Sequence, residues 1–214
     1  MTTFEEIRLS DLTHALTITR GFPTQRTMPE GDVPVMSVAD LRNEASPRHF
    51  ADRDALDDAG VGLAQPGDVL VSVEGGTVGE TLVVPDGSRE FVPSQQVATL
   101  RVIDSSTLDP WYLGAWLTTE AAREQVRRLA RGLTIQRIPI KDLASLTVRI
   151  PPLVDQREIG QRFLAFETAI KSHRAVATCL EDLRNLDLVV TLAESAGSAT
   201  DSSIPTRKAT ARGR

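Results

Sequence analysis

The sequence predicts an α/β (α+β) domain built on a mixed, twisted sheet, followed by one long coiled-coil helix. Residues 63–73 carry a Pro-Gly-Asp turn into a continuous apolar run, and residues 81–84 can return from it as the second strand of a hairpin. After residue 150 the pattern changes, because apolar residues then recur in alternating steps of four and three, the spacing of a coiled-coil seam. The first pattern predicts the sheet, and the second predicts the helix.

Short extended segments precede the hairpin. We expect strands or turns at residues 7–12, 16–20 and 33–38. Residues 38–41 can open a short helix, whereas residues 43–62 are polar and are expected to be irregular. The segment 21–26 has the turn formers and hydrogen-bonding side chains of a surface recognition loop, although such a segment is often only a connection.

A second strand pair and a helix follow the hairpin. Residues 91–92 and 97–102 are expected to pair with each other. Asp109 is a good N-cap and Pro110 suits the first helical position, so a helix is expected to begin there. Its tryptophan and tyrosine side chains are of the type that stacks on bases, but their helical spacing favours packing in the core.

Basic residues crowd into the next helix and the connection after it. This helix is expected over residues 119–131 with Gly132 as its C-cap, and residues 133–138 are expected to form an exposed connection. The basic side chains are Arg123, Arg127, Arg128, Arg131, Arg137 and Lys141. A DNA backbone responds to such a local patch, although the whole chain carries a net charge of −5. The same arginines would also suit a solvated helix face paired with Glu120 and Glu124.

A pair of prolines separates the domain from the long helix. Pro151 and Pro152 must end the strand expected at residues 146–150, because proline cannot donate to a sheet ladder. Asp155 is then the expected N-cap, with Glu158 reaching back as in a capping box. The proline pair therefore marks where the domain ends and the helix begins.

The apolar stripe of the long helix needs a covering surface. Its seam consists of Ile159, Phe163, Phe166, Ile170 and Leu180. A helix that runs to about residue 193 spans roughly 55 Å at about 1.5 Å per residue, which is far longer than the domain needs for its own core. The stripe predicts pairing with a second helix, and the alternative is that it folds back onto its own domain.

Composition excludes several kinds of site. The single cysteine, Cys179, excludes an internal disulfide and a cysteine-based metal cluster, and three scattered histidines give zinc nothing to build on. No apolar run approaches the roughly 20 residues of a membrane span, and the N-terminus lacks a signal-peptide pattern. We therefore expect a cytoplasmic protein with no metal and no membrane partner.

Catalytic motifs are also missing from the sequence. An adenine methyltransferase needs a cofactor-binding glycine loop and an Asp/Asn-Pro-Pro-aromatic motif, and neither occurs. The acidic cluster at residues 52–58 lacks the lysine that accompanies metal-assisted hydrolysis in a nuclease. We expect no catalytic residue and no cofactor.

An ordered series of short motifs runs through the chain. The series comprises Gly21-Phe22, residues 34–37, residues 66–72, Gly76 with Val78-Gly79, Gln95, Tyr112-Leu113 with Trp116-Leu117, Gly132 to Thr134 with Ile138, residues 143–148, and Pro151-Pro152-Leu153 with Gln156 and Ile159. It resembles the DNA specificity subunits of type I restriction-modification systems over nearly everything from Ile7 to Leu188. Members of that family usually carry two recognition domains and two long helices in one chain, so one of each resembles a half-size form.

The resemblance implies sequence-specific binding of double-stranded DNA by a subunit that does not itself catalyse. It implies a DNA target-recognition domain at residues 1–152, a long coiled-coil dimerisation or partner helix at 153–193, and a disordered basic tail at 194–214. The helices of the family hold a DNA methyltransferase subunit and, in complexes that cleave, a restriction/translocase subunit. This helix is expected to form a homodimer or to pair with another specificity chain, and the complex to act on a bipartite site in DNA methylation or phage defence.

Two sets of side chains are the candidates for DNA contact. Base edges are expected to be read by Thr24, Gln25, Arg26, Thr134 and Gln136. Phosphates are expected to be held by Arg128, Arg131, Arg137 and Lys141. The alternative function is a coiled-coil assembly protein that does not bind DNA, in which the α/β domain only caps the helix. Salt-dependent binding to duplex DNA distinguishes the two.

Overall fold

The structure is a computed structural model that describes the backbone of residues 5–200 and the side chains of residues 5–192. The chain divides into two compact units, Met1–Ala165 and Phe166–Arg214. From residue 201 onward, the expected disordered tail lies outside the described residues. Among the helices in the described range, none is long and apolar enough to cross a membrane.

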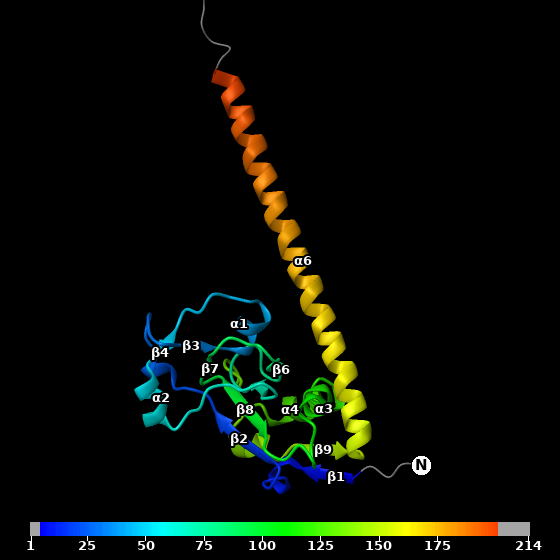
Figure 1. Ribbon diagram of the computed structural model, residues 1–214. Coiled ribbons are helices and arrows are strands. Elements are labelled where there is room, and N and C mark those ends of the chain that lie inside the picture. The colour runs from blue at the N-terminus through cyan, green and yellow to red at the C-terminus, as the bar shows by residue number, and fades with distance from the viewer. Residues whose placement is uncertain (1–4, 201–214) are drawn as a thin grey trace, which may run out of the picture. The chain divides into compact units, whose positions relative to one another are not determined.

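Short strands form three small sheets in the described part of the first unit (Figure 1). The strands are β1 (Glu5–Arg8), β2 (Leu16–Arg20), β3 (Val33–Met36), β4 (Phe50–Ala51), β5 (Val69–Ser72), β6 (Thr81–Val83), β7 (Val92–Pro93), β8 (Val97–Val102) and β9 (Thr147–Ile150). The largest sheet has the antiparallel order β2-β8-β5-β6. In the other two, β1 pairs with β9, and β3 lies between an antiparallel β4 and a parallel β7.

Helices cover both faces of the largest sheet, with α3 and α4 on one side and α1 on the other (Figure 1). The helices are α1 (Val38–Arg42), α2 (Arg53–Ala59), α3 (Pro110–Leu117), α4 (Glu120–Leu129), α5 (Ile140–Leu143) and α6 (Leu153–Thr200), with 3-10 turns η1 (Leu9–Asp11) and η2 (Thr24–Arg26). The predicted fold class is confirmed, because a mixed α/β domain is followed by a long helix. The strands are divided among three sheets.

Strand β5 is buried along its whole length, which explains its continuous apolar run. Val69 and Val71 belong to the core cluster that includes Leu113 of α3. Leu70 faces the other way and shares a second cluster with Val38 of α1. The predicted hairpin is confirmed, because β6 returns antiparallel to β5.

Helix α3 begins as its sequence predicts. The Asp109 side chain accepts a hydrogen bond from the N–H of Tyr112 at 2.8 Å, and Pro110 occupies the first helical position. Tyr112 and Trp116 are buried in the core rather than presented for stacking on bases. The phenol of Tyr112 donates to the carbonyl of Arg149, and burial raises the pKa of the tyrosine.

The prediction that residues 43–62 are irregular is wrong. Strand β4 and helix α2 lie within this segment, and α2 carries three of the aspartates of the acidic cluster. The buried residue of this helix is Leu56, which joins a small cluster with Phe22, and Ala55 and Ala59 pack against the same cluster. Gly60 then closes the helix in the left-handed conformation, with φ of 62°. One buried leucine among aspartates is too weak a pattern to show as a helical period.

The expected pairing of residues 91–92 with 97–102 is also wrong. Strand β7 pairs in parallel with β3, whereas β8 pairs with β2 and β5. The turn between β7 and β8 therefore crosses from one sheet to another instead of closing a hairpin. Both strands are apolar and short, so their sequence alone does not select the partner.

Helix α6 begins at the expected residue 153, but Asp155 is not its N-cap, and the helix ends later than its sequence predicts. It begins at Leu153, so Asp155 lies within its first turn instead of acting as the N-cap, and the N–H of Asp155 donates to the carbonyl of Pro152 at 2.9 Å. The carboxylate of Asp155 still lies at the positive end of the helix dipole. The helix continues to Thr200 instead of ending near residue 193.

The first turns of α6 are tied to the domain by one buried amide. Gln156 is 1% exposed. Its Oε1 accepts from the N–H of Asp109 at 2.9 Å, and its Nε2 donates to the carbonyls of Thr107 at 3.2 Å and Pro151 at 2.9 Å. One side chain therefore joins the start of α6 to the start of α3 and to the end of β9.

Two further residues of α6 pack closely on α3. A Cβ on Gly160 would lie 2.6 Å from Asp109 Oδ1, so only glycine allows this approach. Phe163 is partly buried and packs on the core beside Gly114. At Phe163 the stripe therefore packs on its own domain, which is the alternative that the sequence offered.

Candidate nucleic-acid interface

Two buried residues hold the segment after β2 against β7. Gly21 accommodates the close approach of the chain, because a Cβ there would lie 2.2 Å from the carbonyl oxygen of Ser94. Phe22 is fully buried, and its N–H donates to the carbonyl of Pro93 at 2.7 Å. The turn η2 that follows, Thr24–Arg26, exposes all three of its side chains. Buried motif residues thus position an exposed loop.

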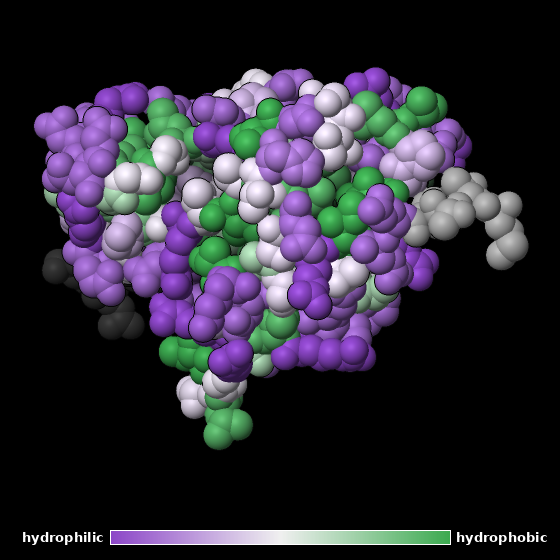
Figure 2. Space-filling model, turned by 90° about the horizontal axis from the view of Figure 1, so that it is seen from below, coloured by the Kyte–Doolittle hydropathy of each residue, from purple (hydrophilic) through white to green (hydrophobic). Residues whose placement is uncertain are grey.

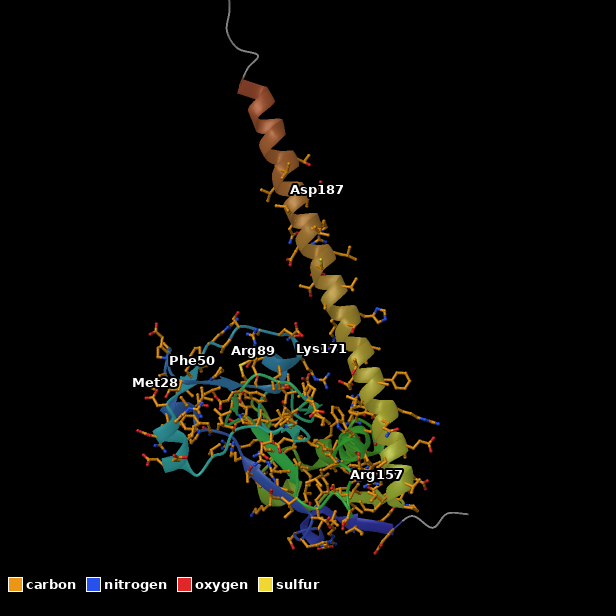
Figure 3. All side chains as sticks on the ribbon, viewed as in Figure 1. Met28, Phe50, Arg89, Arg157, Lys171 and Asp187 are labelled. Atoms are coloured by element: carbon orange, nitrogen blue, oxygen red, sulfur yellow. The ribbon has the colours of Figure 1, made fainter. Side chains whose placement is uncertain are left out.

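The other end of this loop is fixed to β4. The N–H of Met28 donates to the carbonyl of Phe50 at 2.9 Å, and the N–H of Phe50 donates to the carbonyl of Met28 at 2.8 Å. The two residues lie side by side in Figure 3. The segment 23–27, which we call the first loop, is therefore anchored on both sides.

A small hairpin of residues 131–137, which we call the second loop, connects α4 to α5. Two backbone hydrogen bonds close it, from the N–H of Arg131 to the carbonyl of Arg137 at 3.0 Å and in the reverse direction at 2.8 Å. All seven of its residues are exposed. The expected C-cap role of Gly132 is wrong, because α4 ends at Leu129 with Ala130 as its C-cap.

The base of the second loop is attached to the end of β5. The N–H of Gly75 donates to the carbonyl of Gln136 at 3.0 Å, and the N–H of Ile138 donates to the carbonyl of Val73 at 2.8 Å. Ile138 itself is fully buried. The exposed connection predicted from the sequence is thus a hairpin whose base is hydrogen-bonded to the residues after β5.

A chain of polar contacts joins the two loops. The N–H of Thr24 donates to Gln95 Oε1 at 2.9 Å, and Arg20 Nε donates to the Gln95 carbonyl at 2.9 Å. Arg20 Nη2 then lies 2.8 Å from Glu74 Oε2, and Arg137 Nη2 lies 2.8 Å from the same oxygen. One carboxylate therefore holds two guanidinium groups between the loops, at the end of the sheet where β2 and β5 finish.

The candidate DNA-binding residues fall into two groups in the structure. The loops carry Thr24, Gln25, Arg26, Arg131, Thr134, Gln136 and Arg137, all of them exposed. Arg128 and Lys141 lie outside the loops, on α4 and α5. Arg131 is linked to α5 by an ion pair with Asp142 at 2.7 Å. The structure thus brings all five expected base-reading residues onto two adjoining loops, and only part of the expected phosphate-binding set.

Arg127 and Arg128 of α4 are paired with acids on their own helix. Arg127 contacts Glu120 at 2.5 Å and Glu124 at 2.9 Å, and Arg128 contacts Glu124 at 3.1 Å. The hydrogen bond from Arg127 lowers the pKa of the Glu124 carboxyl, and the charge of Arg128 lowers it further. This is the solvated helix face that the sequence offered as the alternative. Such exposed pairs are weak enough for a phosphate to replace the carboxylate.

Two residues of the polar chain between the loops, Arg20 and Glu74, were not among the candidates chosen from the sequence. They lie far apart in the chain and meet because β2 and β5 both pair with β8. The available signal was their position, since Arg20 ends a strand immediately before Gly21 and Glu74 follows the central strand before a pair of glycines. Gln95 belonged to the motif series, and its role is to hold the first loop.

The second unit presents apolar side chains to solvent along α6. Phe166 is 69% exposed, Ile170 is 42% exposed and Leu180 is 60% exposed. Ile159, which lies on α6 in the first unit, is also exposed. Of the five seam residues expected from the sequence, these four are therefore available to a partner.

No group of three histidine, cysteine, aspartate or glutamate side chains arranged for a metal ion occurs among the described residues. The chemistry that the two loops can perform is recognition, because arginine, glutamine and threonine side chains donate to phosphates and base edges.

Comparison with known proteins gives a consistent result. Residues 1–181 match the family model described as the type I restriction modification DNA specificity domain. No curated protein matches the sequence. The structure is similar to the S subunit of a type I restriction-modification system from M. genitalium, with a TM-score of 0.57, 18% identity, and coverage of 80% of this chain and 41% of that one.

Two further structures are similar. A chain from a study of complex assembly and conformational transition of a type I system has a TM-score of 0.57 and 25% identity, over 87% of this chain and 44% of that one. The HsdS subunit from Thermoanaerobacter tengcongensis has a TM-score of 0.54 and 23% identity, over 79% and 38%. This chain spans less than half the length of each of these relatives.

Proposed function

The chain belongs to the type I restriction modification DNA specificity domain family, which is non-catalytic, and from this premise we propose that it binds double-stranded DNA in a sequence-specific manner through its two loops. The observation that carries the proposal is the continuous polar chain from Thr24 through Gln95, Arg20 and Glu74 to Arg137. It keeps two sets of exposed donors and acceptors in one place. As a DNA-binding specificity subunit the chain would act in the cytoplasm.

Binding to duplex DNA should depend steeply on salt. Phosphate contacts release counterions, so log K is expected to fall linearly with log salt concentration, by about 0.9 per phosphate contacted. A fluorescence anisotropy titration of the full chain with a random-sequence duplex at several salt concentrations measures this slope. A chain that binds no duplex at any salt concentration would instead support the assembly protein in which the α/β domain only caps the helix.

Replacing Arg128 and Arg131 together by alanine should weaken binding to all duplexes alike. Each lost phosphate contact is expected to reduce the salt slope by about 1, because phosphates carry no sequence information. The control is Arg157→Ala, which removes an exposed arginine from the start of α6, outside both loops; Figure 3 labels this residue. If the salt slope is unchanged in the double variant, these arginines do not contact phosphates and only form a solvated, ion-paired surface.

Replacing Gln25 or Gln136 by alanine should change which duplexes are preferred. A bidentate contact between an amide and adenine is worth about 1–3 kcal/mol of discrimination. Selection from a random duplex pool, followed by sequencing, measures the preference of each variant. Gln161→Ala, which alters an exposed amide on α6, is the matched control. Equal losses on every sequence would contradict base reading by these two residues.

We also propose that the exposed stripe of the second unit is covered by a second helix. Phe166, Ile170 and Leu180 supply the apolar surface, and a second copy of this chain offers the same surface in return. Antiparallel pairing would give a two-fold axis and a target made of two inverted copies of one short sequence. In the complete complex a DNA methyltransferase subunit, and where present a restriction/translocase subunit, would assemble on the helices.

A further inference from the structure

The tip of the second loop exposes large apolar side chains. Leu133 has a relative exposure of 107%, and Ile135 is 63% exposed. The face of the molecule in Figure 2 is mostly hydrophilic, with hydrophobic residues in small areas between polar ones. Among the exposed large apolar side chains of the described residues, Leu133 has the highest relative exposure.

The backbone of the tip is held in one conformation. Gly132 has φ of 107°, and a Cβ there would lie 2.2 Å from the carbonyl oxygen of Ile135. Only glycine allows the chain to fold back this tightly. With the backbone hydrogen bonds between Arg131 and Arg137 below it, the tip presents Leu133 on a fixed base.

The apolar tip lies within a basic segment. From Glu120 to Asp142 the sequence has six basic and three acidic side chains, an excess of three positive charges in a chain whose net charge is −5. Arg131 and Arg137 flank the tip directly, and the polar residues Thr134 and Gln136 alternate with the two apolar ones. These surrounding positive charges would add little to an apolar contact with another protein. They are complementary to a polyanion such as DNA.

We propose that Leu133, supported by Ile135, is an apolar wedge that inserts between stacked base pairs of the bound duplex and kinks it. The proposal rests on the proposed function, since it names how the second loop engages DNA. Apolar side chains of this kind partially unstack a base step and bend the duplex by about 20–90°. Arg131 and Arg137 would hold the phosphates on either side of the opened step, and Thr134 and Gln136 would then reach the edges of neighbouring bases.

The test uses the full chain and a duplex selected from a random pool by the wild-type protein. Energy transfer between dyes at the two ends of the duplex reports bending, and 2-aminopurine placed at successive positions reports unstacking. Wild type should kink the duplex and brighten one 2-aminopurine position. Leu133→Ser should abolish both signals and weaken binding about tenfold, because the buried contact is lost. Leu133→Phe should retain them.

Two controls separate the wedge from a general loss of binding or of folding. Ile103→Ser removes an apolar side chain that is 55% exposed elsewhere in the first unit, and it should leave bending and affinity unchanged. Gly132→Ala keeps Leu133 but disturbs the tip, so it should reduce bending as well. Circular dichroism should show native helix content for every variant, since the altered side chains are exposed.

Each other outcome overturns the proposal in a distinguishable way. If wild type binds duplex DNA in a salt-dependent manner and Leu133→Ser bends it equally, the wedge is refuted and the proposed function stands. If Leu133→Ser bends DNA normally but no longer assembles with the methyltransferase subunit or a second copy, the tip is a protein contact. If wild type binds no duplex at all, the proposed function fails and the wedge fails with it.

Discussion

Replacing Gln156 by alanine is expected to lower the free energy of unfolding of the first unit by about 3 kcal/mol. The side chain is almost fully buried and makes three hydrogen bonds, to the Asp109 N–H and to the carbonyls of Thr107 and Pro151. Alanine would leave these three backbone groups without a partner in a site closed to water, and each costs about 1–3 kcal/mol when it is unsatisfied. Urea unfolding followed by circular dichroism measures the change.

Gln161→Ala is the matched control for this prediction. It removes the same side chain from the same helix at an exposed position, and surface substitutions of this kind change stability by about 0.5 kcal/mol or less. Gln156→Glu is a second comparison, because it keeps the shape and the acceptor but loses the two donated hydrogen bonds. If Gln156→Ala is as stable as the control, water must enter the site and satisfy the same groups, and the amide would not be what ties α6 to α3.

The elements that follow from local patterns were predicted correctly from the sequence. Helix α3 is marked by an N-cap aspartate and a first-position proline, and the β5–β6 hairpin is marked by a turn and an apolar run. These signals are contained within a few residues, so a single sequence carries them. The N-cap of α6 was misplaced because Asp155 is a good cap, whereas the helix begins at Leu153, directly after Pro152.

The elements that depend on distant partners could not be predicted. Strand β7 is two residues long and pairs with β3, which precedes it by more than fifty residues, and helix α2 contributes one buried residue, Leu56, to its cluster. Neither element shows a helical or strand-like hydrophobic period in its sequence. The packing of neighbouring elements decides both, and this information is absent from the local pattern.

The candidate site follows the same division. Both loops were identified from their exposed polar residues, since turn formers and amides mark a recognition loop. The ion pairs of Arg20 and Arg137 with Glu74 were not identified, because they depend on the register in which β2 and β5 pair with β8. Of the residues expected in the seam of α6, four are exposed, whereas Phe163 packs beside Gly114, which leaves room for an aromatic ring.

Replacing Phe166 by glutamate is expected to convert a paired chain into a monomer. Phe166 is 69% exposed in the second unit, where Ile170 and Leu180 continue the stripe. Burying a phenylalanine contributes about 2 kcal/mol, so a symmetric pair would lose about 4 kcal/mol, which is roughly a thousandfold in Kd. The introduced carboxylates would weaken the pair further, because a charge in an apolar seam must be desolvated. Light scattering at micromolar concentration measures the molar mass.

Ala175→Glu provides the control for this change. Position 175 is nine residues further along, two and a half turns at 3.6 residues per turn, so it faces away from Phe166 on the same helix. It introduces the same charge outside the stripe, and the pair should survive. Both variants should keep the circular dichroism and the salt-dependent DNA binding of the first unit. If wild type is itself a well-behaved monomer at micromolar concentration, self-pairing is excluded, and the stripe must be covered by another specificity chain or by the methyltransferase subunit.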